Sequence, residues 1–77
     1  MTFKEKRKLL GLTQAEVARV AGIYKENYNR FENGKSKMIT KRKELVLEFF
    51  KEYESMVEEK ENLIKKYEKK ASILLTL

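Results

Sequence analysis

The hydrophobic and polar positions divide the chain into two halves with different patterns. Through residue 34, apolar groups recur at helical spacing, and glycines at positions 11, 22 and 34 separate three segments. Beyond Gly34 the sequence contains no glycine and no proline, so no strong helix breaker interrupts it. We therefore predict an all-α fold, with short helices in the first half and a helical second half from Thr40 to about Leu75.

The first half carries clear signals for two helices joined by a tight turn. Thr13 and Glu16 have the spacing of a capping box, which predicts a helix from Gln14 to Val20. Gly22 can adopt the positive φ that a tight turn requires. A second helix is then expected from about Tyr24 to Glu32, because Asn-Gly follows it directly and glycine commonly ends a helix.

Three stretches of this half are similar to the helix-turn-helix family of phage repressor and Cro proteins. They are Gly11-Leu12-Thr13-Gln14-Ala15-Glu16-Val17-Ala18, Ala21-Gly22-Ile23 and Arg30-Phe31-Glu32-Asn33-Gly34-Lys35. The resemblance covers about residues 3–37 and implies a small lambda-repressor-like domain that binds double-stranded DNA. It departs after Lys37, where the proline often found in the family is missing.

The second helix of this segment has a polar face that is the candidate for reading DNA bases. The residues on it are Lys25, Glu26, Asn29, Arg30 and Asn33, of which we expect the first four to contact bases. Arginine and lysine pair with guanine, asparagine with adenine, and glutamate with cytosine, in the major groove. The resemblance implies phosphate contacts by Gln14, Lys35 and Lys37. The alternative interpretation of each polar side chain is an ordinary solvated surface.

The resemblance also implies a structural ion pair between Arg7 and Glu32. Arg7 belongs to a first short helix, predicted from Phe3 to Leu10, whose residues Phe3, Leu9 and Leu10 are expected to face inward. Breaking one side of a buried pair leaves an uncompensated charge, so this pair predicts a stability effect. In the second helix of the motif, Tyr28 and the residue three positions later, Phe31, are expected to face the core.

Composition and charge narrow the functional classes. The net charge of +6 lies mainly in the first half: residues 1–40 have nine Lys or Arg and four Glu (+5), whereas residues 41–77 have nine and eight (+1). A basic surface there suits a polyanionic partner. The absence of Cys and His removes the usual zinc ligands and the commonest catalytic side chains. We therefore predict a protein that binds no metal, needs no cofactor and is not an enzyme. The sequence contains no long apolar run, so we predict no membrane span. It also gives no indication of a small-molecule pocket.

The second half repeats its apolar positions every seven residues. The seam residues that this period predicts are Phe50, Tyr53, Val57, Ile64, Tyr67 and Leu74. One interpretation is a single amphipathic helix from near residue 40, which pairs with a second copy as a coiled coil. It divides the chain into a helix-turn-helix domain (1–50) and a dimerisation helix (51–77). The other interpretation is a hairpin broken near Ser55–Asn62 that packs back on its own domain.

The resemblance, together with the charge pattern, implies a sequence-specific transcription regulator in the bacterial cytoplasm or nucleoid. In the family that the chain resembles, such proteins are most often repressors, and we expect a homodimer on an inverted-repeat operator. The alternative is a protein-interaction module, in which the C-terminal amphipathic helix binds a partner protein and the first half is mainly a scaffold. The position of the basic excess favours DNA binding, because that excess lies in the helix-turn-helix half.

Overall fold

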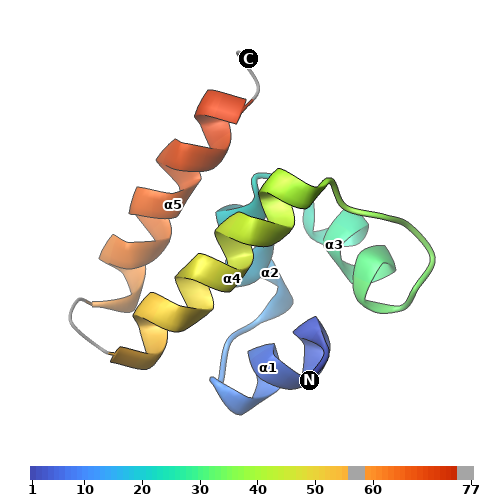
Figure 1. Cartoon of the computed structure of the whole chain (residues 1–77), viewed down its shortest axis with the longest axis horizontal. Coiled ribbons are helices and arrows are strands. Elements are labelled where there is room, and N and C mark those ends of the chain that lie inside the picture. The colour runs from blue at the N-terminus through green and yellow to red at the C-terminus, as the bar shows by residue number, and fades with distance from the viewer. Residues whose placement is uncertain (56–58, 75–77) are drawn as a thin grey trace.

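The computed structural model describes residues 1–55 and 59–74, and these residues form an all-helical fold (Figure 1). The helices are α1 (Phe3–Leu9), α2 (Gln14–Ala21), α3 (Lys25–Glu32), α4 (Thr40–Ser55) and α5 (Lys60–Leu74). The predicted all-α class is therefore confirmed, and α2 and α3 form the expected helix-turn-helix. None of these helices is both long enough and apolar enough to cross a membrane.

Local signals in the sequence explain where the first helices begin and end. Capping boxes open two of them, Thr2 with Glu5 at α1 and Thr13 with Glu16 at α2. The prediction for Leu9 was wrong: this residue is 68% exposed. Positions 3, 7 and 10 form the inner stripe of the α1 segment at helical spacing, and position 9 lies off that stripe.

Gly22 joins α2 to α3 in a position that only glycine fits. Its φ is 72°, in the left-handed region that residues with a Cβ rarely adopt. A Cβ built at this position would lie 2.6 Å from the Cβ of Ala71 in α5 and 2.6 Å from Nη1 of Arg42 in α4. The turn therefore depends on glycine for its backbone conformation and for the close approach of α5.

The C-terminal half is a helical hairpin, so the interpretation as one continuous helix was wrong. The first helix of the hairpin, α4, ends at Ser55, and α5 begins at Lys60, within the alternative break near Ser55–Asn62. Figure 1 shows α5 turned back beside α4, and α5 also packs against α2. The Tyr67 ring of α5 meets Phe49 of α4 edge-on, with ring centroids 5.6 Å apart.

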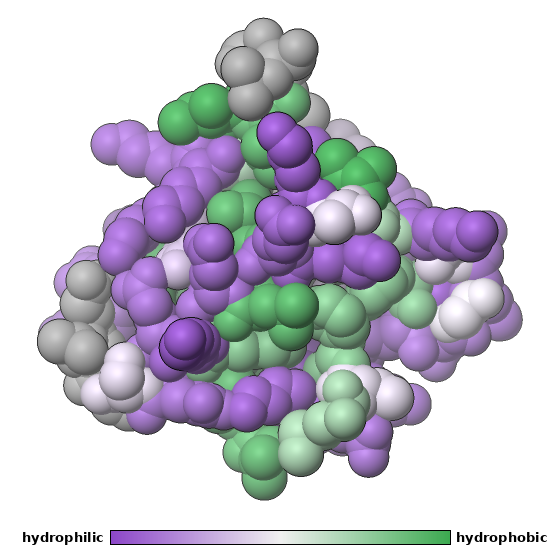
Figure 2. Space-filling model, viewed as in Figure 1, coloured by the Kyte–Doolittle hydropathy of each residue, from purple (hydrophilic) through white to green (hydrophobic). Residues whose placement is uncertain are grey.

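The predicted dimer seam is mostly interior. Phe50, Ile64 and Tyr67 are at most 1% exposed, and Tyr53 stacks on Phe49 with partial burial. Leu74 is half-buried, and Val57 lies outside the described residues. Among the described residues of the stripe, Phe50, Ile64 and Tyr67 are thus buried within one protomer, which corrects their assignment to a dimer interface. On the face seen in Figure 2, hydrophobic surface lies interspersed with hydrophilic side chains.

Ion pairs fix the register of α5 on α2. The Arg19 guanidinium of α2 donates to Glu61 at 2.7 and 3.0 Å and to Glu68 at 2.8 and 3.0 Å, and Lys60 pairs with Glu16 at 2.7 Å. The hydrogen bonds from Arg19 hold the pKa values of the Glu61 and Glu68 carboxyls below their ordinary range. Because these side chains are 20–49% exposed, the pairs add orientation more than stability.

One hydrophobic core contains side chains from both halves. It includes Val17 and Val20 of α2, Phe49 of α4, and Leu63 and Ile64 of α5. The boundary predicted at residue 50 falls inside α4, and α5 completes the core of the helix-turn-helix instead of forming a separate domain. The recognition segment consequently rests on a scaffold that includes the C-terminal helix.

Candidate nucleic-acid interface

The outer face of α3 gathers the predicted base-contact residues at one place. Lys25, Glu26, Asn29 and Arg30 are all exposed, and together with Gln14 from the start of α2 they line a shared shallow groove. The face forms because helical spacing turns Glu26 and Arg30 away from the buried Tyr28, with Lys25 and Asn29 on the flank between the two sides. The structure thus brings these four residues and one of the candidate phosphate contacts onto a single surface.

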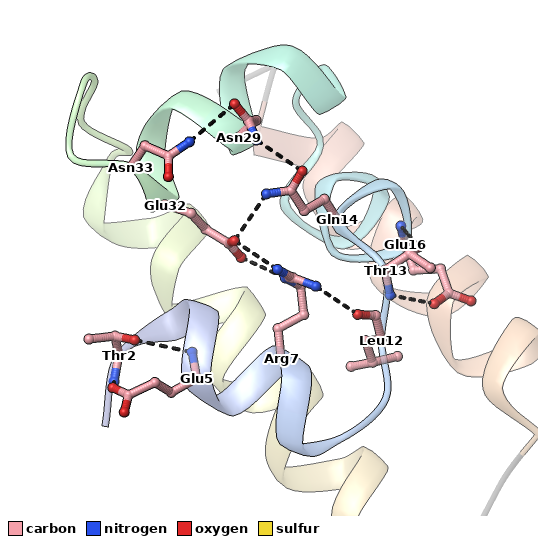
Figure 3. Close-up of polar contacts among 10 residues, drawn as sticks. All are labelled: Thr2, Glu5, Arg7, Leu12, Thr13, Gln14, Glu16, Asn29, Glu32 and Asn33. Atoms are coloured by element: carbon pink, nitrogen blue, oxygen red, sulfur yellow. Dashed lines mark hydrogen bonds and ion pairs between the residues drawn. The ribbon is translucent and has the colours of Figure 1, made fainter.

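Behind this face, hydrogen bonds connect α1 to α3 and to the loop before α2 (Figure 3). The Arg7 guanidinium donates to both oxygens of Glu32, from Nε at 2.8 Å and from Nη2 at 3.0 Å. Its Nη1 donates to the Leu12 carbonyl at 3.0 Å. The Glu32 side chain is fully buried and that of Arg7 is 9% exposed, so this bidentate pair lies in the interior.

The same carboxylate orients two residues of the groove. The Gln14 amide donates to Glu32 Oε1 at 3.1 Å, and the Asn29 amide donates in turn to Gln14 Oε1 at 3.1 Å. Asn33 continues the chain by donating to Asn29 Oδ1 at 3.3 Å. A carboxylate only accepts, so the Gln14 amide must present its nitrogen to Glu32 and its oxygen to Asn29. The buried pair therefore sets the orientation of polar groups at the surface.

The environment of Glu32 keeps it ionised. Burial alone would raise the pKa of its carboxyl, but hydrogen bonds, led by those from Arg7, outweigh burial and lower the pKa. The Tyr28 hydroxyl lies beside this carboxylate, and burial followed by the Glu32 charge raises the pKa of Tyr28. Tyr28 is fully buried, as expected for a residue on the core side of α3, and Phe31 is half-buried beside it.

Lys35 and Lys37 lie outside this groove, in the loop between α3 and α4. Both are exposed, and the backbone N–H of Lys35 donates to the Arg30 carbonyl at 2.8 Å. Lys37 lines a different cavity, on the flank of α3 that faces α4. The cations therefore flank α3, whereas Gln14 lies at the N-terminus of α2, where backbone donors favour an anion.

Tyr24 has a position that the sequence analysis treated only as a helix start. It precedes α3 directly, and its side chain is 79% exposed. The sequence signal that could have drawn attention to Tyr24 is an aromatic residue immediately before a helix with a polar face. Within the described residues, no group of three or more Asp, Glu, His or Cys side chains could hold a metal ion.

The comparisons with known proteins agree with this geometry. A family model described as helix-turn-helix matches residues 3–43, which is more than half of the 77-residue chain. The matched region runs from α1 into the first turn of α4 and contains every residue of the groove. No curated protein and no solved structure matches the chain.

Proposed function

Because the chain belongs to the Cro/C1-type helix-turn-helix family of DNA-binding transcription regulators, we propose that it is a repressor that occupies an inverted-repeat operator. The observation that carries this proposal is the groove on α3, where Lys25, Glu26, Asn29 and Arg30 are exposed together. An α-helix fits the major groove of B-DNA, and these side-chain types discriminate between base edges there.

Phosphate contacts on both sides of α3 would orient it on the duplex. We assign them to Gln14 at the N-terminus of α2 and to Lys35 and Lys37 in the loop after α3. Backbone N–H groups at a helix start and exposed lysines both attract phosphate, and such contacts supply affinity that falls with salt. They position the protein without reading sequence, so specificity would rest on the α3 groove.

We propose that two copies associate mainly on DNA. Two half-sites provide the read length and the phosphate contacts that one small domain lacks. Phe50, Ile64 and Tyr67 already fill the protomer core, so pairing through them would require opening the hairpin. We therefore expect a monomer in solution and a two-to-one complex on the operator, where repression would result from blocking access of the polymerase.

The burial of α5 argues against the protein-interaction alternative. Leu63, Ile64, Tyr67 and Ala71 form the apolar side of this helix, and all are at most 2% exposed. A partner protein could not reach that side without displacing α5 from α2 and α4. The excess of basic residues also lies in residues 1–40, which contain the helix-turn-helix, and this favours DNA over a protein partner of α5.

Arg30→Ala and Lys35→Ala are expected to affect DNA binding in different ways. Losing a base contact at Arg30 should cost about 1–3 kcal/mol on the operator and relax preference at one base pair per half-site. Losing a phosphate contact at Lys35 should weaken binding to all duplexes alike and reduce the salt slope by about one. Affinity measured on operator and random duplexes across salt concentrations distinguishes the two. Equal losses on both duplexes for Arg30→Ala would assign it to the backbone instead.

The direct test of the proposed function is selection of bound duplexes from a random pool. We expect the selected sequences to share an inverted repeat, and sedimentation of the complex to show two protein copies per duplex. A pool that shows no enrichment at low salt, or a protein with no affinity for random duplex, would reject DNA recognition by this chain. Enrichment of a single unrepeated site would reject the paired arrangement.

A further inference from the structure

A second concave site lies between α3, the loop after it and the start of α4. The loop, which lies between the helices labelled α3 and α4 in Figure 1, closes one side of the cavity. Its volume is about 240 Å³. The polar side chains that line it are Asn27, Ser36, Lys37 and Arg42, and part of its apolar wall comes from Ile23 and Phe31. No carboxylate is among the lining residues, so two cations share this cavity without an acidic neighbour in its wall.

Arg42 is the unusual member of this set, because it is buried without a carboxylate. Arg42 is 9% exposed, and its Nη1 donates to the carbonyls of Ala21 at 2.7 Å and Gly22 at 3.3 Å. In the described part of the chain, no carboxylate lies within ion-pair distance of it. The other buried arginine, Arg7, is neutralised by Glu32 at 2.8 Å. The carbonyls at the α2 C-terminus offer Arg42 only partial negative charge, so among the described residues no full negative charge pairs with this guanidinium.

We propose that this cavity binds a small organic anion, a carboxylate with a compact apolar part. The carboxylate would lie between Arg42 and Lys37 and accept hydrogen bonds from both cations. Asn27 and Ser36 would supply further hydrogen-bond donors, and the apolar part would contact Ile23 and Phe31. Pockets for drug-sized ligands measure about 300–1,000 Å³, so the ligand is smaller than these, of about the size of benzoate. The sequence predicted no such pocket, because α3, its following loop and α4 create it only on folding.

Ligand binding here would weaken DNA binding, a consequence that rests on the proposed function. Lys37 is one of the residues assigned above to phosphate, and a bound carboxylate would occupy its ammonium group and reduce the positive charge at this site. The loop that carries Lys35 would also be held against α3. The anion would thus act as an inducer, which releases the protein from its operator by competing with backbone phosphate for the same lysine.

The test uses benzoate as the probe, with benzamide as its uncharged isostere. Titration of the full chain without DNA, followed by amide NMR shifts at constant ionic strength, should give saturable binding of benzoate centred on Asn27, Ser36 and Arg42. Benzamide should bind at least about tenfold more weakly, because the charge-assisted hydrogen bonds are lost. Lys37→Gln should weaken benzoate binding by about the same factor. Lys35→Gln, an identical change in the same loop outside the cavity, should leave it unchanged.

Several results would overturn the proposal. They are equal binding of benzoate and benzamide, equal losses in Lys37→Gln and Lys35→Gln, or shifts that stay linear with concentration. A further arm adds duplex DNA. If benzoate does not bind the free protein and Lys37→Gln still lowers the salt slope, the two cations serve a backbone phosphate, and the small-anion proposal is wrong. Because the benzoate titration contains no DNA, a failure of DNA recognition would leave its outcome unaffected.

Discussion

Ile64→Glu is expected to unfold the protein. Ile64 has no exposed surface and lies in the core where α5 packs on α2 and α4. A carboxylate there would lose its hydration without gaining a partner, a change that costs more than about 4 kcal/mol. A chain of this length is stable by about 4–12 kcal/mol, so a loss of this size would remove from about a third to all of the folding free energy. Circular dichroism during thermal and urea unfolding measures the effect.

Ile73→Glu is the matched control for this change. It lies on the same helix and introduces the same carboxylate, but Ile73 is 58% exposed. We expect its unfolding free energy to remain within about 0.5 kcal/mol of the original value. If Ile64→Glu instead melted like the unchanged protein, α5 would not be docked in solution. Sedimentation would then show whether the two C-terminal helices pair between copies.

Glu32→Ala is expected to destabilise the fold by about 3–5 kcal/mol. The change strands the Arg7 guanidinium, whose side chain is 9% exposed and which donates twice to this carboxylate. The exposed Glu48→Ala on α4 should have little effect and serves as the control. Urea unfolding of both variants compares the two losses. An unchanged unfolding midpoint for Glu32→Ala would show that the pair contributes nothing to stability.

A double variant separates the stability of this pair from its role at the surface. Arg7→Met with Glu32→Leu replaces the buried charges by apolar side chains of similar size, so stability should recover to near that of the original chain. Gln14 would still lose its acceptor and Asn29 its ordered neighbour. We therefore expect a well-folded protein with weaker DNA binding. Full recovery of both stability and affinity would show that Glu32 does not position the groove.

The same carboxylate predicts acid sensitivity. The folded structure lowers the pKa of Glu32, and Arg19 lowers those of Glu61 and Glu68, so the unfolded chain binds more protons near pH 4. Their stabilisation is complete above the ordinary carboxyl value of about 4.3 and is lost as pH falls through the lower folded values. Unfolding free energy should thus be level from about pH 5.5 to 7 and should decrease below about pH 4.5. In Glu32→Ala the decrease should be smaller.

Local sequence signals determined the first half of the fold. The capping residues at Thr13 and Glu16 and the positive φ at Gly22 act over a few residues, so they can be recognised without tertiary information. The spacing of Lys25 through Arg30 likewise placed the candidate base contacts on one face, since helical geometry alone decides which residues share a side. The link from Glu32 through Gln14 to Asn29 needed the structure, because it joins side chains 18 and 15 residues apart.

The second half was decided by tertiary packing. A seven-residue apolar repeat predicts that one side of a helix is buried, but either a second copy or the protein's own core can bury it. The hairpin was selected by contacts that carry no local signal. Arg19 pairs with Glu61 and Glu68, which are 42 and 49 residues away in the sequence. The missing side chain of Gly22 leaves room for Ala71. The sequence by itself therefore determined which surfaces must be covered, whereas only the folded chain decided that α5 covers them.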